Sequence, residues 1–110
     1  MNFKPKRVKE RLETIKTDPK RAMYHSWVNL GERWPVAEPF IMKDPKYALA
    51  YATNVIKGRW PEAEQYIMKE PQTAYQYAMY VLRNRWPEAE PFIKTSPAAW
   101  YSYRKHFKIK

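Results

Sequence analysis

The stretch RWPEAE at residues 59–64 decides the fold, because near-copies of it recur at residues 33–38 (RWPVAE) and 85–90 (RWPEAE). The three copies begin 26 residues apart, at positions 33, 59 and 85. A fixed period of roughly 20 to 50 residues is typical of repeat architectures. The period predicts four units within a single domain that covers residues 1–110. The predicted units are residues 7–32, 33–58, 59–84 and 85–110.

A second landmark is a proline that follows a potential helix-capping residue once in every unit. The four pairs are Asp18-Pro19, Asp44-Pro45, Glu70-Pro71 and Ser96-Pro97. The first unit keeps this landmark although it lacks the Trp-Pro pair, and the two outer units diverge most from the repeat. Divergent outer units are expected when terminal units cap a stack and face water on one side.

Each unit is predicted to form a short helix followed by a longer one. Pro35 suits the first turn of a short helix, whereas Pro39 predicts that this helix begins late or is kinked. Gln65 replaces that proline in the third unit, so the fold does not require it. Asp44 is predicted to be a strong N-cap of the next helix. Asp18 and Ser96 offer the same oxygen, and Glu70 is expected to be a poorer cap.

The longer helices are predicted from apolar residues at helical spacing. In the second unit these residues are Ala48, Tyr51, Ala52, Val55 and Ile56, which share one helix face. Gly58 is predicted to follow the helix in left-handed conformation, with Asn84 as its counterpart and Gly31 shifted by one position. No strand-like alternation occurs. The predicted fold class is therefore all-α, with four helix–turn–helix units stacked as a small αα solenoid.

Tryptophan and arginine recur side by side at the start of three units. The tryptophans Trp34, Trp60 and Trp86 are interpreted as structural residues wedged between successive units. An exposed row of stacking platforms is the alternative. The preceding arginines, Arg33, Arg59 and Arg85, are expected to lie over those indoles or to bond helix-end carbonyls. The alternative for the arginines is a row of exposed basic side chains, one in each unit.

The net charge of +10 is unevenly distributed along the chain. Residues 1–21 hold eight Lys/Arg and three acids, and residues 94–110 hold five Lys/Arg and no acid. The intervening residues hold eight of each, so the two ends carry the whole excess. Such patches attract polyanions or acidic proteins, although a charge excess also simply promotes solubility.

Composition also limits localisation and the class of protein. There is no cysteine, which excludes a disulfide framework and thiolate metal sites. No apolar run follows the basic amino-terminal residues, and no segment is long enough to span a bilayer. We therefore expect a cytoplasmic protein without a secretory signal or a membrane partner.

Signatures of catalysis are missing from the sequence. The carboxylates of Glu62 and Glu64 lie two residues apart and point away from one another on a helix. His25 and His106 have no companion ligands at metal spacing. His25 falls in the column of the repeated tyrosines and is expected to be a packed residue. With two glycines there is no phosphate-binding loop. We expect no enzymatic activity, no cofactor, no metal and no small-molecule substrate.

Surface recognition remains as the expected activity. Helical projection places aromatic and basic side chains on an outer face, where they resemble protein-interface anchors or platforms for single-stranded nucleic acid. A third interpretation is that Tyr24 and Trp27 cover the core edge of the first unit. The residues assigned to binding are Lys20, Arg21, Tyr24, Trp27, Lys46, Tyr47, Tyr80, Arg83, Lys105 and Lys108.

The motif WPEAEQYIMKEP at residues 60–71, followed by AYQYA at residues 74–78, resembles short tandem α-helical repeats of tailed-phage and related large-virus proteins. The resemblance covers roughly residues 33–100, and it transfers no functional residue. It implies a phage origin and action in the host-cell cytoplasm as a host-directed binder or inhibitor.

Two functions follow as expectations. The first is a non-enzymatic helical-repeat protein that binds and inhibits or redirects a host macromolecule, either a protein or a ribonucleoprotein, such as a defence component. The alternative is direct binding of single-stranded RNA or DNA through the basic ends and the aromatic outer face. The two differ in salt dependence, because each neutralised phosphate releases counterions.

Overall fold

The computed structural model describes residues 11–110 of the chain. Within this range every regular element is helical, so the all-α prediction is confirmed. Residues 7–10, which belong to the predicted first unit, lie outside the described residues. Residues 11–15 are helical and are followed, in chain order, by α2 (Pro19–Tyr24), η1 (His25–Leu30), α3 (Glu38–Ile41), α4 (Pro45–Tyr51), η2 (Ala52–Ile56), α5 (Pro61–Ile67), α6 (Pro71–Tyr77), η3 (Ala78–Leu82), η4 (Pro87–Ala89), α7 (Glu90–Ile93) and α8 (Pro97–Phe107).

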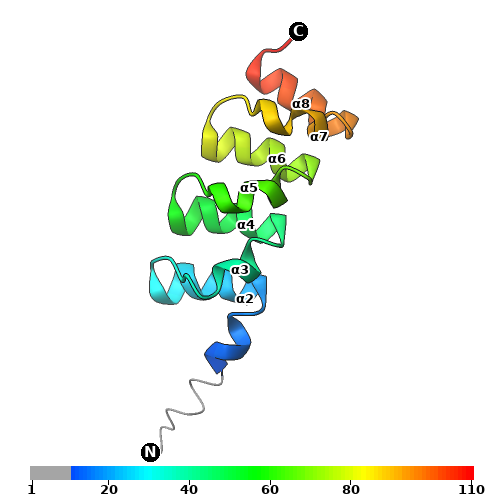
Figure 1. Ribbon diagram of the computed structural model, residues 1–110. Helices are drawn as coiled ribbons and strands as arrows, with labels where there is room; N and C mark the ends of the chain where they lie inside the picture. Colours follow the sequence, from blue (N-terminus) through cyan, green and yellow to red (C-terminus); the bar gives the residue numbers. More distant parts are fainter. Residues whose placement is uncertain (1–10) are drawn as a thin grey trace, which may run out of the picture.

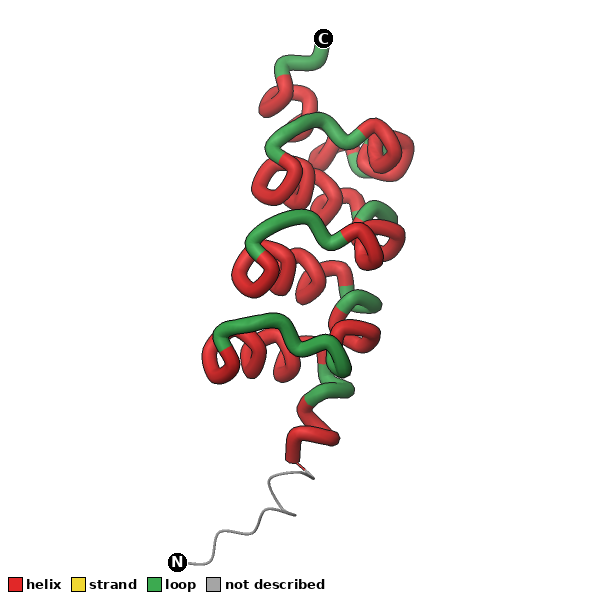
Figure 2. The backbone as a smooth tube through the Cα atoms, turned by 60° about the vertical axis from the view of Figure 1, so that its left-hand side comes forward, coloured by secondary structure: helices red, strands yellow, loops and turns green. Residues whose placement is uncertain are grey.

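The helices are stacked in chain order along one axis (Figures 1 and 2). The long helices α4, α6 and α8 begin at positions 45, 71 and 97, which are 26 residues apart. Each long helix packs against the next, α2 against α4, α4 against α6, and α6 against α8. Each short helix contacts the long helix before it and the long helix after it. The stack is elongated, with extents of 64 × 21 × 20 Å.

The core consists of columns of one residue type that run through the stack. Alanines such as Ala48 and Ala52 are fully buried, and their small side chains allow neighbouring helices to approach closely. Buried isoleucines of the short helices and tyrosines of the long helices complete the core. These are Ile41, Ile67, Ile93, Tyr51, Tyr77 and Tyr103.

The late start predicted for the short helix that contains Pro39 is confirmed. α3 begins at Glu38, with Pro39 as its second residue. In the third unit Gln65 supplies the N–H that proline lacks, and α5 begins at Pro61. The fourth unit carries Pro91 at this position, and there a 3₁₀ turn precedes a short α7. A single proline therefore sets the length of the α-helix in this part of each unit.

The capping predictions are partly wrong. Asp18 accepts hydrogen bonds from the N–H groups of Lys20 and Arg21, and Ser96 also caps its helix. Asp44 makes no side-chain capping bond, whereas Glu70 accepts one from the N–H of Thr73 at 2.6 Å. The backbone is extended at every one of these caps. The difference therefore lies in side-chain rotamer and reach.

The prediction that Gly58 and Asn84 adopt the left-handed conformation is also wrong, because the left-handed residue lies one position earlier in each of these units. Lys57 and Arg83 adopt the left-handed conformation, with φ of 61° and 56°, as does Gly31 at the same repeat position, with φ of 69°. The last turns η1, η2 and η3 are π-helical. The N–H of Lys57 consequently bonds the carbonyl five residues earlier, that of Ala52, at 2.7 Å. Gly31 therefore stands at the left-handed position of the repeat, whereas Gly58 stands one residue after it.

Candidate functional site

A polar network that the sequence interpretation missed connects the two helices of the third unit. The backbone N–H of Trp60 donates to the hydroxyl oxygen of Tyr77 at 2.8 Å, and that hydroxyl donates to Glu64 Oε2 at 2.7 Å. Arg59 then donates from Nε and Nη2 to the two oxygens of Glu64, at 3.0 and 2.8 Å. The network thus satisfies the hydrogen-bonding groups of three partners together. They are the N–H at the start of the short helix, a buried carboxylate and a tyrosine hydroxyl of the long helix.

The same network recurs in the second and fourth units. Its members there are Arg33, Trp34, Glu38 and Tyr51, and then Arg85, Trp86, Glu90 and Tyr103. The expectation that the arginines lie over indoles or bond helix-end carbonyls is therefore wrong, because carboxylates five residues later hold them. In the first unit Leu12 and His25 occupy the positions of the glutamate and the tyrosine. The recurrence of Arg, Glu and Tyr at a fixed spacing was the sequence signal for this network.

The recurring tryptophans pack at a tilt against a ring of the preceding unit. The rings of Tyr51 and Trp60 are 4.8 Å apart, and those of Tyr77 and Trp86 are 4.9 Å apart. Trp34 lies 4.9 Å from the ring of His25. Trp60 and Trp86 are buried, and Trp34 is half-buried. The indole N–H of Trp60 has no hydrogen-bond partner among the described residues.

Burial shifts the pKa of the network tyrosines. It raises the pKa of Tyr51 and Tyr77 above the usual range, and the pKa of Tyr103 to about 12. The carboxylates that accept hydrogen bonds from their hydroxyls raise these pKa values further. In the fourth unit the hydrogen bonds from Arg85, together with that from Tyr103, lower the pKa of Glu90. The network is therefore built for neutral tyrosine and ionised glutamate.

We expect the protein to lose stability in alkaline solution as these tyrosines ionise. A raised folded-state pKa contributes stability that is fully present below the unfolded-state pKa of about 10 and is lost as the pH rises through the folded-state value. For Tyr103 the loss falls between about pH 10 and about pH 12. Urea midpoints measured from pH 8 to pH 12 should fall in this window, and less steeply for Tyr103→Phe. Midpoints that stay constant up to pH 12 would contradict the buried network.

The first unit carries an exposed aromatic cluster, defined here as Tyr24, Trp27 and Val28. Tyr24 is 46% exposed and Trp27 is 44% exposed, and their rings stack 6.1 Å apart. Val28 is exposed as well. A hollow of about 380 Å³ beside the cluster is lined in part by Tyr24, Val28, Lys20 and Arg21. Rings and cations assigned to binding from the sequence therefore do lie together here.

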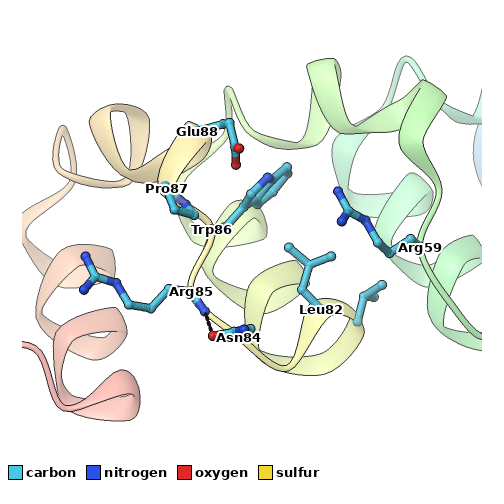
Figure 3. A pocket seen from close by; sticks show the side chains of 8 residues that line it. Arg59, Leu82, Asn84, Arg85, Trp86, Pro87 and Glu88 are labelled. Carbon is cyan, nitrogen blue, oxygen red and sulfur yellow. Dashed lines mark hydrogen bonds between the residues drawn. The ribbon is translucent and has the colours of Figure 1, made fainter.

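Two further hollows adjoin one another where the third unit meets its neighbours. The first, of about 240 Å³, is lined in part by Tyr80, Lys57 and Arg83. The second, of about 340 Å³, is lined in part by Arg59 and Trp86 (Figure 3). In this view Arg59 points toward Trp86, whereas the guanidinium of Arg85 points away. Val81 lines both hollows, so they are neighbours on the surface. The hollow around Tyr80, Lys57 and Arg83 is called the junction depression.

A fourth hollow lies at the C-terminal end of α8. Its volume is about 360 Å³, and its lining includes Tyr101, Arg104, Lys105 and Lys108. The ammonium of Lys105 lies 5.5 Å from the centroid of the Tyr101 ring, a cation–π distance. Tyr101 is exposed, and it was not among the residues assigned to binding.

The residues assigned to binding thus fall into four local groups. Lys20, Arg21, Tyr24 and Trp27 belong to the first unit, Tyr80 and Arg83 to the junction depression, and Lys105 and Lys108 to the end of α8. Lys46 lies over the ring of Tyr47. Tyr47 is half-buried and packs against the core.

Residues 11–110 contain no group of three or more His, Cys, Asp or Glu side chains that could hold a metal ion. No helix in the same part of the chain is both long and apolar enough to cross a membrane. Comparison of the chain with protein-family models, with curated proteins and with solved structures gives no match.

Proposed function

We propose that this protein is a non-enzymatic helical-repeat binding protein that inhibits or redirects a host macromolecule, with the aromatic cluster of its first unit as the principal contact. The target is a host protein or a ribonucleoprotein. The host-directed part of the proposal rests on the resemblance of the repeat to those of tailed-phage proteins. The contact itself rests on the exposure of Tyr24 and Trp27.

The repeat does not require aromatic residues at these positions. Ala50 stands at the Tyr24 position of the second unit, and Thr53 stands at the Trp27 position. The fold therefore accepts small side chains at both places. Two large rings left nearly half exposed cost solubility without completing the core. Exposed Trp and Tyr side chains next to cations are the kind of residue that dominates protein interfaces.

The test is affinity capture from a host-cell lysate by the tagged full chain, with and without nuclease. We expect Tyr24→Ala/Trp27→Thr, which copies the second unit, to lose the captured partner. Truncation of interface anchors of this kind reduces affinity by roughly 30-fold or more. Val36→Glu is the matched control, because it removes another exposed apolar side chain and copies Glu62 and Glu88 at the same repeat position.

Three outcomes of the capture experiment have clear meanings. Retention of the partner by Val36→Glu and its loss by the double variant support the proposal. Equal capture by the wild type and the double variant overturns the aromatic cluster as the contact. Loss of all captured material after nuclease treatment overturns a protein target and favours direct binding of nucleic acid.

A further inference from the structure

Cationic residues occupy a backbone position where glycine would be less strained. Lys57 and Arg83 have left-handed φ values of 61° and 56°, which non-glycine residues adopt at a cost in free energy. The first unit has Gly31 at the same repeat position, so the fold accepts glycine there. The charge of the helix macrodipole favours cations near a helix C-terminus, but any residue of the last turn could supply that charge without a left-handed backbone.

An exposed tyrosine shares a hollow with the two cations. Tyr80 is 58% exposed and shares its hollow with Lys57 of the preceding unit and with Arg83 of its own. Val28, Asn54 and His106 stand at the Tyr80 position in the other units, so the core does not need a tyrosine there. Neither Lys57 nor Arg83 forms an ion pair within residues 11–110.

The neighbouring hollow, which Val81 also lines, contains a third cation. Arg59, whose side chain is 60% exposed although it is paired with Glu64, points into the neighbouring hollow (Figure 3). Glu88 is the acidic side chain that lines this hollow. The junction depression, around Tyr80, is lined by cations, the tyrosine and small or aliphatic residues, and by no acid.

We propose that the depression defined by Lys57, Tyr80 and Arg83 binds single-stranded nucleic acid, with a base stacked on Tyr80 and the flanking phosphates on the two cations. Proteins that bind single strands combine a basic groove with exposed aromatic rings. Helical-repeat proteins that bind RNA contact about one base per repeat, and neighbouring helices lie about 8–10 Å apart. An aromatic ring that shares a hollow with cations of two successive units matches that arrangement. Poly-glutamate, which offers charge without a base to stack, distinguishes this ligand from an acidic protein.

This depression joins the second and third units and is separate from the aromatic cluster of the first. The inference therefore goes beyond the proposed function and can fail independently of it. A ribonucleoprotein target would engage both surfaces, its protein on the aromatic cluster and its RNA on the depression.

The test uses fluorescence anisotropy of labelled oligo(dT) and oligo(U) with the purified full chain, between 50 and 200 mM salt. We expect Lys57→Gly/Arg83→Gly to lower the slope of log K against log salt by about 1.4, since each phosphate contact on a single strand contributes about 0.7. We expect Tyr80→Asn, which copies Asn54, to weaken binding at least roughly fivefold, the lower end for loss of one stacked base. The salt slope of this variant should not change.

The matched control is Lys43→Thr/Lys69→Thr, which removes the same net charge and copies Thr95 at that repeat position. These lysines lie in the turns before α4 and α6, whereas Lys57 and Arg83 follow the ends of η2 and η3. We expect the control to keep the wild-type salt slope. The glycine variant should melt at or above the wild-type temperature, because glycine favours the left-handed backbone. Loss of binding in that variant would then not reflect unfolding.

Several results would overturn the inference. They are no oligonucleotide binding by the wild type at 50 mM salt, an equal loss in the Lys43/Lys69 control, or poly-glutamate binding as tightly as the oligonucleotide. The last result would reassign the depression to acidic proteins. Normal oligonucleotide binding by Tyr24→Ala/Trp27→Thr, together with lost lysate capture, would separate this surface from the proposed function.

Discussion

Trp60→Ala is expected to lower the free energy of unfolding by about 3–5 kcal/mol, as other large-to-small changes in protein cores do. Trp60 is 1% exposed, and its ring lies 4.8 Å from that of Tyr51 in the preceding unit. Its removal leaves a cavity between two units that cannot collapse without moving a helix pair. Total stabilities of about 5–15 kcal/mol are usual for domains, so this one change is large enough to unfold much of the protein at moderate temperature.

Urea unfolding followed by circular dichroism measures this loss, and two variants make it specific. Tyr80→Ala removes an exposed ring and should cost less than about 1 kcal/mol. Trp60→Phe should cost less than Trp60→Ala, because it keeps much of the ring and also removes the indole N–H that has no partner among the described residues. Equal losses for Trp60→Ala and Tyr80→Ala would contradict the interpretation of Trp60 as a wedge between units.

The second large effect is expected for Tyr77→Phe, which removes one oxygen from the polar network of the third unit. The Tyr77 hydroxyl accepts from the N–H of Trp60 and donates to Glu64. Without it, a buried N–H has no acceptor and a buried carboxylate loses a donor. Leaving such groups unsatisfied costs about 1–3 kcal/mol, and we expect the loss of unfolding free energy to fall in that range.

Tyr66→Phe is the matched control for this prediction. The half-buried Tyr66 stands at the repeat position that holds Phe40 and Phe92, so removal of its hydroxyl copies residues that the chain already uses. The free energy of unfolding of this variant should stay close to that of the wild type. Losses of the same size in Tyr77→Phe and Tyr66→Phe would mean that the network contributes nothing beyond an ordinary hydroxyl.

The network also explains why the repeat tolerates a buried carboxylate. Glu64 is buried, and a buried charge is costly unless it is paired and hydrogen-bonded. Arg59 and Tyr77 together make three hydrogen bonds to its two oxygens. Because the same atoms recur in the second and fourth units, each unit contains its own complete set of partners. In the first unit, with Leu12 and His25 at those positions, His25 contacts the second unit through its ring pair with Trp34.

Local signals in the sequence determined the helical class, the helix starts and the effect of proline. The landmarks Pro45, Pro71 and Pro97 each begin a long helix, because proline at the first helical position loses no hydrogen bond. The difference between Pro39 and Gln65 sets where α3 and α5 begin. These features depend on a few neighbouring residues, so the order of residues along the chain is enough to predict them.

The tertiary structure alone decided which side chains meet and where the helices end. Tyr77 reaches Trp60 and Glu64 from a different helix. The recurring spacing of Arg, Glu and Tyr does not by itself decide whether Arg59 binds the carboxylate or an indole. The left-handed residue is Lys57 rather than Gly58, because the N–H of Lys57 closes the π-helical last turn on the carbonyl of Ala52 and the chain turns there. The sequence names the rings and cations, but packing between units decides that Tyr47 is half-buried while Tyr24 and Tyr80 remain exposed.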